Sequence, residues 1–287
     1  YQYQDHHYAE SLDVYNQVLK TAGEKGVPEP LAVTAANVCI ADAAGQPDET
    51  KRLAAARQIL EAYLKQHPDD ARVTVALGQV MLQQGDAQGA EQMAQKASGS
   101  KDADIDAQIL AINARLHEKK TSDALALITP LTVSHSNIPD VWYLLGMADS
   151  DAGDLKSAED AFRKALALNP NYAMAKRALL TTEIRDGNTA AAQLLAMEII
   201  RDDHYFMPAW AVTCDNLRAH GQQEQARQML ISLANDPQLP PDAHVELVSL
   251  LLTVNAPDEA ANLIKTLPAN DPARQRLESE SALASGN

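Results

Sequence analysis

Two arginines, a tyrosine and a methionine are the residues whose types and spacing could recognise a ligand. Arg177 and Arg185 lie eight residues apart, so one helix would present them on the same face, just over two turns apart. Tyr143 and Met147 are spaced i, i+4 and would form an apolar platform on one helix face. Guanidinium groups bind carboxylates through paired hydrogen bonds, so these side chains could hold an acidic or C-terminal carboxylate group beside an apolar side chain.

The same arginines have a second interpretation. Asp151, Glu183 and Asp215 are acidic residues on neighbouring predicted helices and could pair with the arginines. The pairs would then only hold the surface together. The sequence leaves both interpretations open.

The sequence contains no familiar arrangement for catalysis or for a bound metal ion. Phosphate-binding and dinucleotide-binding glycine motifs, H-E-x-x-H, C-x-x-C and calcium-loop patterns do not occur. His6 and His7 stand alone, whereas a metal site needs three or four ligands. We therefore predict no enzyme activity, no cofactor and no metal site in this segment.

Residues 139–170 predict two helices joined by a turn at 152–154. Small residues at Gly146 in the first helix and Ala158 in the second would let the helices approach closely. Trp142 and Phe162 would supply the bulk between them. One such hairpin cannot bury its own apolar face, so similar neighbours are required.

Two features of this hairpin recur every 34 residues. The turn position steps through Gly85, Lys119, Gly153, Gly187, Gly221 and Asn255. The second-helix alanine steps through Ala90, Ala124, Ala158, Ala192, Ala226 and Ala260. Glycine and asparagine suit a tight or left-handed turn, so the period predicts an array of helical hairpins.

The hairpin resembles the tetratricopeptide repeat, whose pattern is W-x2-L-G…A-x3-F…P. The matching residues are Trp142, Leu145, Gly146, Ala158, Phe162 and Pro170. The resemblance covers most of the chain, and the composition resembles that of bacterial members. It implies an all-α fold, a right-handed superhelical solenoid of about seven helix-turn-helix repeats with terminal helices.

The period predicts where the repeats begin and end. The predicted repeats are 31–70, 71–104, 105–138, 139–172, 173–206, 207–240 and 241–274. Residues 1–30 are interpreted as the second helix of a truncated repeat, which would make the chain a piece of a longer polypeptide, or as an N-terminal cap. Residues 271–287 are interpreted as a C-terminal capping helix and tail. Pro130 lies in a predicted second helix and is expected to kink or shorten it near Ile128.

Net charge indicates which class of partner suits the chain, and apolar runs and cysteines bear on membrane insertion and disulfides. The 287 residues carry a formal net charge of −15, and such a surface repels nucleic acid and anionic lipid. It suits soluble protein partners, basic ones especially. No run of 18 apolar residues occurs, so we predict no membrane insertion by this segment. Cys39 and Cys214 fall in different repeats, so we expect buried thiols and no disulfide between them.

In the tetratricopeptide family the first helices line the concave side of the superhelix, where peptides or partner helices bind. The resemblance therefore implies a binding groove here. Its predicted residues are Gln79, Asn113, Tyr143, Met147, Arg177, Thr181, Arg185, Asp215 and Arg218. Members that grip chaperone tails carry lysine, asparagine and arginine at set first-helix positions. Here the matching positions hold Val75 and Gln79, then Leu110, then Asp140 and Leu144, so chaperone-tail binding is not predicted.

The resemblance implies a non-catalytic scaffold or adaptor that binds a peptide or partner protein in its groove. We consider that this scaffold could act in envelope assembly, secretion or protein maturation. It could be part of a longer membrane-anchored chain. Two alternatives stay open: a regulatory or recruiting segment of a larger enzyme, and a solenoid that self-assembles through its Tyr8 and Tyr15 face. The sequence does not decide between a periplasmic and a cytoplasmic location.

Overall fold

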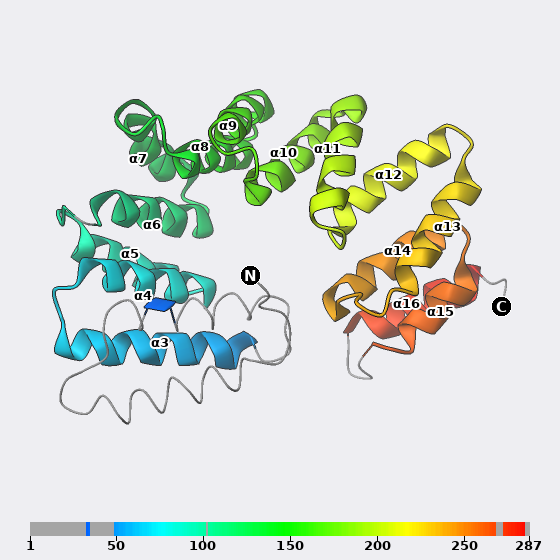
Figure 1. The fold of residues 1–287 in the computed structure, drawn as a ribbon, viewed down its shortest axis with the longest axis horizontal. Helices are drawn as coiled ribbons and strands as arrows, with labels where there is room; N and C mark the ends of the chain where they lie inside the picture. Colours follow the sequence, from blue (N-terminus) through cyan, green and yellow to red (C-terminus); the bar gives the residue numbers. More distant parts are fainter. Residues whose placement is uncertain (1–32, 35–48, 102, 268–271, 285–287) are drawn as a thin grey trace. The chain divides into compact units, whose positions relative to one another are not determined.

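The computed structural model describes residues 33–34, 49–101, 103–267 and 272–284. All regular secondary structure in these ranges is helical, so the all-α prediction is confirmed there (Figure 1). The chain divides into two compact units, Tyr1–Leu168 and Asn169–Asn287, and each is described by itself. The predictions for residues 1–30, His6, His7 and Cys39 lie outside the described residues.

In the first compact unit, each described helix packs against the next one along the chain. The helices are α3 Glu49–Gln66, α4 Ala71–Gln83, α5 Ala87–Ala97, α6 Asp104–His117, α7 Thr121–Ser134, α8 Pro139–Ala152 and α9 Leu155–Leu168. Helices α4, α6 and α8 are the first helices of successive hairpins. Helix α4 contacts α6, and α6 contacts α8, as first helices do when similar hairpins stack side by side.

The second compact unit continues the same alternation. Its helices are α10 Ala173–Asp186, α11 Thr189–Asp202, α12 Met207–Ala219, α13 Gln223–Ala234, the short 3₁₀ helix η2 Pro241–Ala243, α14 His244–Thr253, α15 Pro257–Ile264 and α16 Pro272–Ala284. Helix α16 lies against α14 and α15, and its Leu277 is fully buried in their apolar cluster. A helix is therefore present in the predicted C-terminal capping segment. The repeat boundaries themselves stay a prediction.

The turn of every described hairpin has the same backbone conformation at the predicted position. The φ angles are +81° at Gly85, +59° at Lys119, +87° at Gly153, +76° at Gly187, +73° at Gly221 and +60° at Asn255. This left-handed conformation ends the first helix and reverses the chain. It explains why glycine recurs there, because glycine alone adopts it without a Cβ penalty.

The recurring second-helix alanines lie where the helices of each hairpin meet. Each of the six is at most 1% exposed. A methyl side chain keeps the two helix backbones close, and larger neighbours fill the rest of the interface. The 34-residue alanine series therefore marks the apolar seam that the period predicted.

In the hairpin of α8 and α9, Gly146 and Phe162 make the close contact that their sizes predicted. A Cβ atom added at Gly146 would lie 2.5 Å from Phe162 Cε1, and Phe162 is fully buried. Trp142, the second bulky residue predicted between the helices, is only half-buried. Its indole N–H donates to the Ser136 carbonyl at 2.8 Å, and the Lys164 ammonium lies 4.3 Å from its ring centroid.

Helix α7 continues past Pro130 to Ser134, so the prediction that Pro130 shortens it near Ile128 is wrong, and the alternative of a kink there stays a prediction. Proline removes only one donor, the one that would bond the Ala126 carbonyl four residues earlier. Ala126 and Pro130 are both exposed, so water can hydrate that carbonyl. The Thr129 hydroxyl also donates to the Leu125 carbonyl at 2.7 Å in the same turn.

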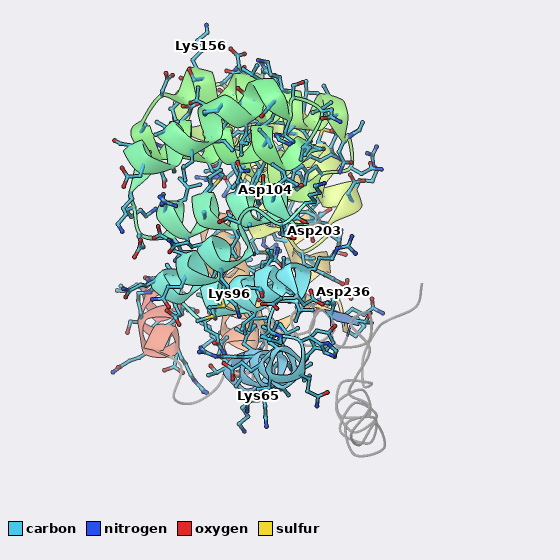
Figure 2. The ribbon with its side chains drawn as sticks, turned by 90° about the vertical axis from the view of Figure 1, so that its left-hand side faces the viewer. Lys65, Lys96, Asp104, Lys156, Asp203 and Asp236 are labelled. Carbon is cyan, nitrogen blue, oxygen red and sulfur yellow. The ribbon has the colours of Figure 1, made fainter. Side chains whose placement is uncertain are left out.

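Several charged side chains project from the helices into solvent (Figure 2). Lys156 projects from α9, and Lys65 and Lys96 are likewise exposed (Figure 2). Among the described residues, no helix is both long enough and apolar enough to cross a membrane.

Candidate functional site

Helix α10 exposes three of the predicted groove residues along one face. Arg177 lies near its start, Thr181 one turn later and Arg185 in its last turn, and all three are exposed. The Thr181 hydroxyl donates to the Arg177 carbonyl at 3.1 Å, so this hydroxyl is turned toward its own helix. The guanidinium groups therefore provide the charge that this face presents.

Arg177 is held in one orientation by two neighbours. It forms an ion pair with Asp203, and its guanidinium carbon lies 4.8 Å from the centroid of the Phe206 ring. Asp203 caps the end of α11 and Phe206 precedes α12, so Arg177 ties α10 to the next hairpin. About 44% of the Arg177 side chain stays exposed, which leaves part of the guanidinium open to a ligand.

The predicted carboxylate partners of the arginines are only partly correct. Arg218 does pair with Asp215, at 3.0 Å, but both residues belong to α12. Arg177 uses Asp203, which was not predicted. Asp151 pairs with Lys119 at 3.4 Å.

Tyr143 and Met147 lie on α8 in the first compact unit and are half-buried. Both pack against the apolar cluster of α6, α7 and α8. The Tyr143 ring centroid is 6.0 Å from that of Phe162, and burial raises the pKa of Tyr143 above its usual value. Much of the predicted platform is therefore part of the core and less open than expected.

The other predicted residues of the first compact unit are Gln79 and Asn113. Gln79 is exposed on α4, and Asn113 is half-buried on α6. Tyr143 and the arginines belong to different compact units, so a groove that joins them stays a prediction.

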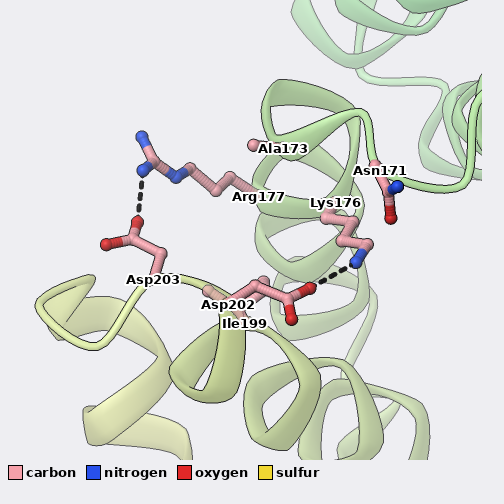
Figure 3. A pocket seen from close by; sticks show the side chains of 7 residues that line it. All are labelled: Asn171, Ala173, Lys176, Arg177, Ile199, Asp202 and Asp203. Carbon is pink, nitrogen blue, oxygen red and sulfur yellow. Dashed lines mark hydrogen bonds and ion pairs between the residues drawn. The ribbon is translucent and has the colours of Figure 1, made fainter. Parts of the chain in front are cut away.

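A cavity of about 280 Å³ lies between the start of α10 and the end of α11 (Figure 3). Its lining consists of Asn171, Ala173, Lys176, Arg177, Ile199, Asp202 and Asp203. We call this cavity the α10–α11 pocket. Ile199 forms an apolar wall that is 2% exposed, and charged groups of both signs surround it.

Two ion pairs cross the α10–α11 pocket (Figure 3). The Lys176 ammonium donates to Asp202 at 2.7 Å, and Arg177 pairs with Asp203. Arg201 also donates to Asp202, at 3.2 Å. Lys176 and Arg201 hold the pKa of Asp202 below its usual value, so this carboxylate is charged and can accept further hydrogen bonds.

Lys176, Asp202 and Asp203 were not among the predicted site residues, although the 34-residue period carries a signal for Lys176. Trp142, Lys176 and Trp210 follow one another at 34-residue steps. Trp210 donates to the His204 carbonyl at 2.7 Å, and Trp142 donates to Ser136, six residues before the tryptophan in both cases. The lysine at position 176 of this series indicates that the α10–α11 hairpin lacks the indole and its hydrogen bond to the preceding turn.

A second cavity and the one described cysteine are weaker candidates for a functional site. A cavity of about 310 Å³ in the first compact unit is lined partly by Arg115 and Glu91, which form an ion pair at 2.7 Å. Cys214 is buried, and burial raises its pKa to about 11, so it is a poor nucleophile at neutral pH. Within the described ranges, no three His, Cys, Asp or Glu side chains gather as a metal site would require.

Family models for the tetratricopeptide repeat match two parts of the chain, residues 43–110 and residues 139–172. The second match coincides with the repeat predicted around Trp142 and Phe162. A tetratricopeptide repeat protein from Parabacteroides merdae is similar in fold, with a TM-score of 0.54 at 17% identity over 86% of this chain and 98% of that one. PilF of Pseudomonas aeruginosa has a TM-score of 0.56 at 18% identity, over 73% of this chain and 97% of that one.

A curated relative is the cellulose synthase 1 operon protein C of Komagataeibacter xylinus. It is 26% identical over 160 residues, which are 52% of this chain and 12% of the relative. The chain thus matches only a small part of that protein's length. The 34-residue period, the helical hairpins and the two family-model matches lead to one conclusion: the chain contains tetratricopeptide repeats at residues 43–110 and 139–172, in a fold similar to that of solved tetratricopeptide repeat structures.

Proposed function

We propose that this protein is a non-catalytic scaffold that binds a peptide or a partner protein on the exposed faces of its first helices. Tetratricopeptide repeats are protein–protein interaction modules, and that general role follows from the family. The observation that supports the proposed site is the exposed row of Arg177, Thr181 and Arg185 on α10.

The chemistry of this row favours an acidic group on the partner. Asp203 and Phe206 orient Arg177 before any partner arrives, so binding loses less side-chain entropy. A carboxylate can accept hydrogen bonds from the part of the guanidinium that stays exposed. Because the chain as a whole is acidic, a local cationic row is a distinctive feature by which a partner could recognise it.

The test compares capture of proteins from a lysate of the source organism by the intact chain and by the Arg177→Glu/Arg185→Glu variant. We expect the variant to lose at least one protein that the intact chain retains, because two cations become anions on the binding face. Arg276→Glu is the matched control, since Arg276 is exposed on α16 and pairs only weakly with Glu280, at 3.8 Å.

Thermal melting of each variant shows whether a loss of capture is a loss of fold. Arg177→Glu brings two carboxylates together at Asp203, so its melting temperature must be measured. If it falls, the charge swap Arg177→Glu/Asp203→Arg restores the pair while still changing the exposed charge. Identical captured proteins from all variants would contradict the proposed binding face.

A second candidate function is suggested by the curated relative from Komagataeibacter xylinus. In this role the chain would be the recruiting segment of a larger assembly for polysaccharide synthesis. Affinity purification from the source organism under native conditions distinguishes the two roles. Recovery of a glycan synthase subunit with the chain favours the second candidate, and its absence from an otherwise specific capture favours a different partner.

A further inference from the structure

The α10–α11 pocket has a counterpart one repeat later, in the same compact unit. Stepping 34 residues along the sequence takes Asn171 to Tyr205, Ala173 to Met207, Lys176 to Trp210 and Asp202 to Asp236. Both sets surround the start of a first helix and the end of its second helix. The two sites can therefore be compared position by position.

In the later hairpin these positions are filled by large side chains. Met207 is 3% exposed and Trp210 is 5% exposed, and Tyr205 packs against the same apolar cluster. The Tyr205 hydroxyl donates to Asp236 Oδ2 at 2.9 Å. The carboxylate at the end of the second helix thus accepts a hydrogen bond from a phenol that the chain itself supplies.

In the earlier hairpin three of these side chains are smaller or narrower. Asparagine replaces tyrosine at 171, alanine replaces methionine at 173, and lysine replaces tryptophan at 176. The volume left open is about 280 Å³. Asp202 is still present at the position of Asp236, and 43% of its side chain is exposed. The acceptor remains, but position 171 carries an asparagine where the later hairpin has the phenol of Tyr205.

We propose that the α10–α11 pocket accepts a tyrosine side chain from the bound partner, with its hydroxyl donating to Asp202. This inference rests on the proposed binding function and names one residue type that the partner supplies. The tyrosine would take the place that Tyr205 occupies in the next hairpin.

The rest of the lining suits a phenol. Ile199 and Ala173 give apolar contact to the ring. The exposed Arg177 and the largely buried Lys176 add two cations to the lining, and cations interact favourably with aromatic faces. Arg177 already lies over the Phe206 ring in this way. Asp202 accepts from Lys176 and Arg201, and a carboxylate has room for further donors.

The probe is N-acetyl-L-tyrosinamide, titrated into the intact chain with isoleucine methyl groups labelled for NMR. The Ile199 methyl signal reports the pocket, and Ile264, buried in α15, is the internal reference. We expect a saturable shift of Ile199 and none of Ile264. N-acetyl-L-phenylalaninamide lacks the hydroxyl, so its affinity should be roughly fivefold lower, the loss of one hydrogen bond.

The matched variants fill the pocket from within. Asn171→Tyr copies the later hairpin and should abolish the Ile199 response. Asn137→Tyr makes the same change one repeat earlier, where Leu168 stands in place of the aspartate, and should leave the response intact. Ala173→Met, the counterpart of Met207, is a second filling variant should Asn171→Tyr fold poorly.

The proposal is overturned if Ile199 does not respond up to the solubility limit of the probe, or if both filling variants respond as the intact chain does. Equal affinities for the two amides would overturn the hydrogen bond to Asp202. The binding function has its own test, the protein capture described above. If the Ile199 signal does not shift but partner capture is intact, only the tyrosine proposal is contradicted. If the Ile199 signal shifts but no partner is captured, the scaffold function is contradicted.

Discussion

Lys119 occupies the left-handed turn position that glycine occupies in four other described hairpins. Its φ of +59° brings its Cβ close to the following carbonyl, which costs roughly 1 kcal/mol or more for a residue with a Cβ. The Lys119 ammonium does reach Asp151 at 3.4 Å, but 78% of its side chain is exposed, and an ion pair so exposed adds little. The turn is therefore formed at this residue in spite of its side chain.

We expect Lys119→Gly to raise the free energy of unfolding by about 0.5–1 kcal/mol, because glycine removes the Cβ clash. Urea denaturation followed by circular dichroism measures the change. Lys120→Gly is the matched control: Lys120 has φ of −85°, so glycine there relieves nothing and should lower stability. An unchanged or lower stability for Lys119→Gly would show that the turn is not strained.

At Gly146 the constraint is the space available for a side chain, whereas at Lys119 it is the backbone conformation. Its missing side chain leaves room for the Phe162 ring, so the Cβ of alanine would overlap Phe162 Cδ1 and Cε1 at 2.6 and 2.5 Å. Alanine gains about 1 kcal/mol over glycine in a helix, but this ring is fully buried and cannot move aside freely.

We expect Gly146→Ala to lower the free energy of unfolding by about 1–3 kcal/mol, as overpacking of a core does. The measurement is a double-mutant cycle with Phe162→Leu, again by urea denaturation. The two changes should partly compensate, so Phe162→Leu should destabilise the Gly146→Ala variant less than it destabilises the native chain. Strict additivity would mean that the ring does not limit residue 146.

At the scale of elements, α7 and α10 depart from the regular hairpin in different ways. Helix α7 contains Pro130 and still runs to Ser134, because proline removes only one helix hydrogen bond and does so at the exposed residue Ala126. Helix α10 carries Lys176 at the position of Trp142 and Trp210, and so holds α11 by ion pairs where the next hairpin uses an aromatic cluster. Both departures leave the helices themselves intact.

We expect Pro130→Ala to raise the free energy of unfolding by about 1 kcal/mol or more, because it restores a helix hydrogen bond and removes the ring's contact with the preceding turn. Pro139→Ala is the control. Pro139 is the first residue of α8, where proline costs nothing, so its replacement should not stabilise the protein. Thermal and urea unfolding of both variants give the comparison, and equal effects would contradict this account of α7.

At the scale of the whole molecule, the net charge of −15 is the dominant property. Like-charged copies repel one another at low ionic strength, whereas basic groups on other proteins are attracted. The charge therefore favours a scaffold for other proteins over the alternative of self-assembly.

Light scattering at increasing concentration distinguishes these two roles. We expect a constant mass near the 31.0 kDa of one chain, at low salt and at physiological salt. A mass that rises with concentration would favour self-assembly, and its dependence on salt would show whether charge opposes it.

The fold class followed from the sequence because each hairpin is a local structure. The turn at Gly153, the alanine at Ala158 and the contact of Gly146 with Phe162 all lie within one repeat, so their spacing along the chain reports their positions in space. The same locality made the period visible over most of the chain.

Only the tertiary structure showed which charged side chains meet. Arg177 pairs with Asp203 and Lys176 with Asp202, each 26 residues away, and no spacing rule within a helix links them. The structure also placed Tyr143 against the core and showed the pocket left by Asn171, Ala173 and Lys176. Repeat spacing determines the backbone, but side-chain pairing depends on the rotamers and volumes of particular neighbours, and these vary from one repeat to the next.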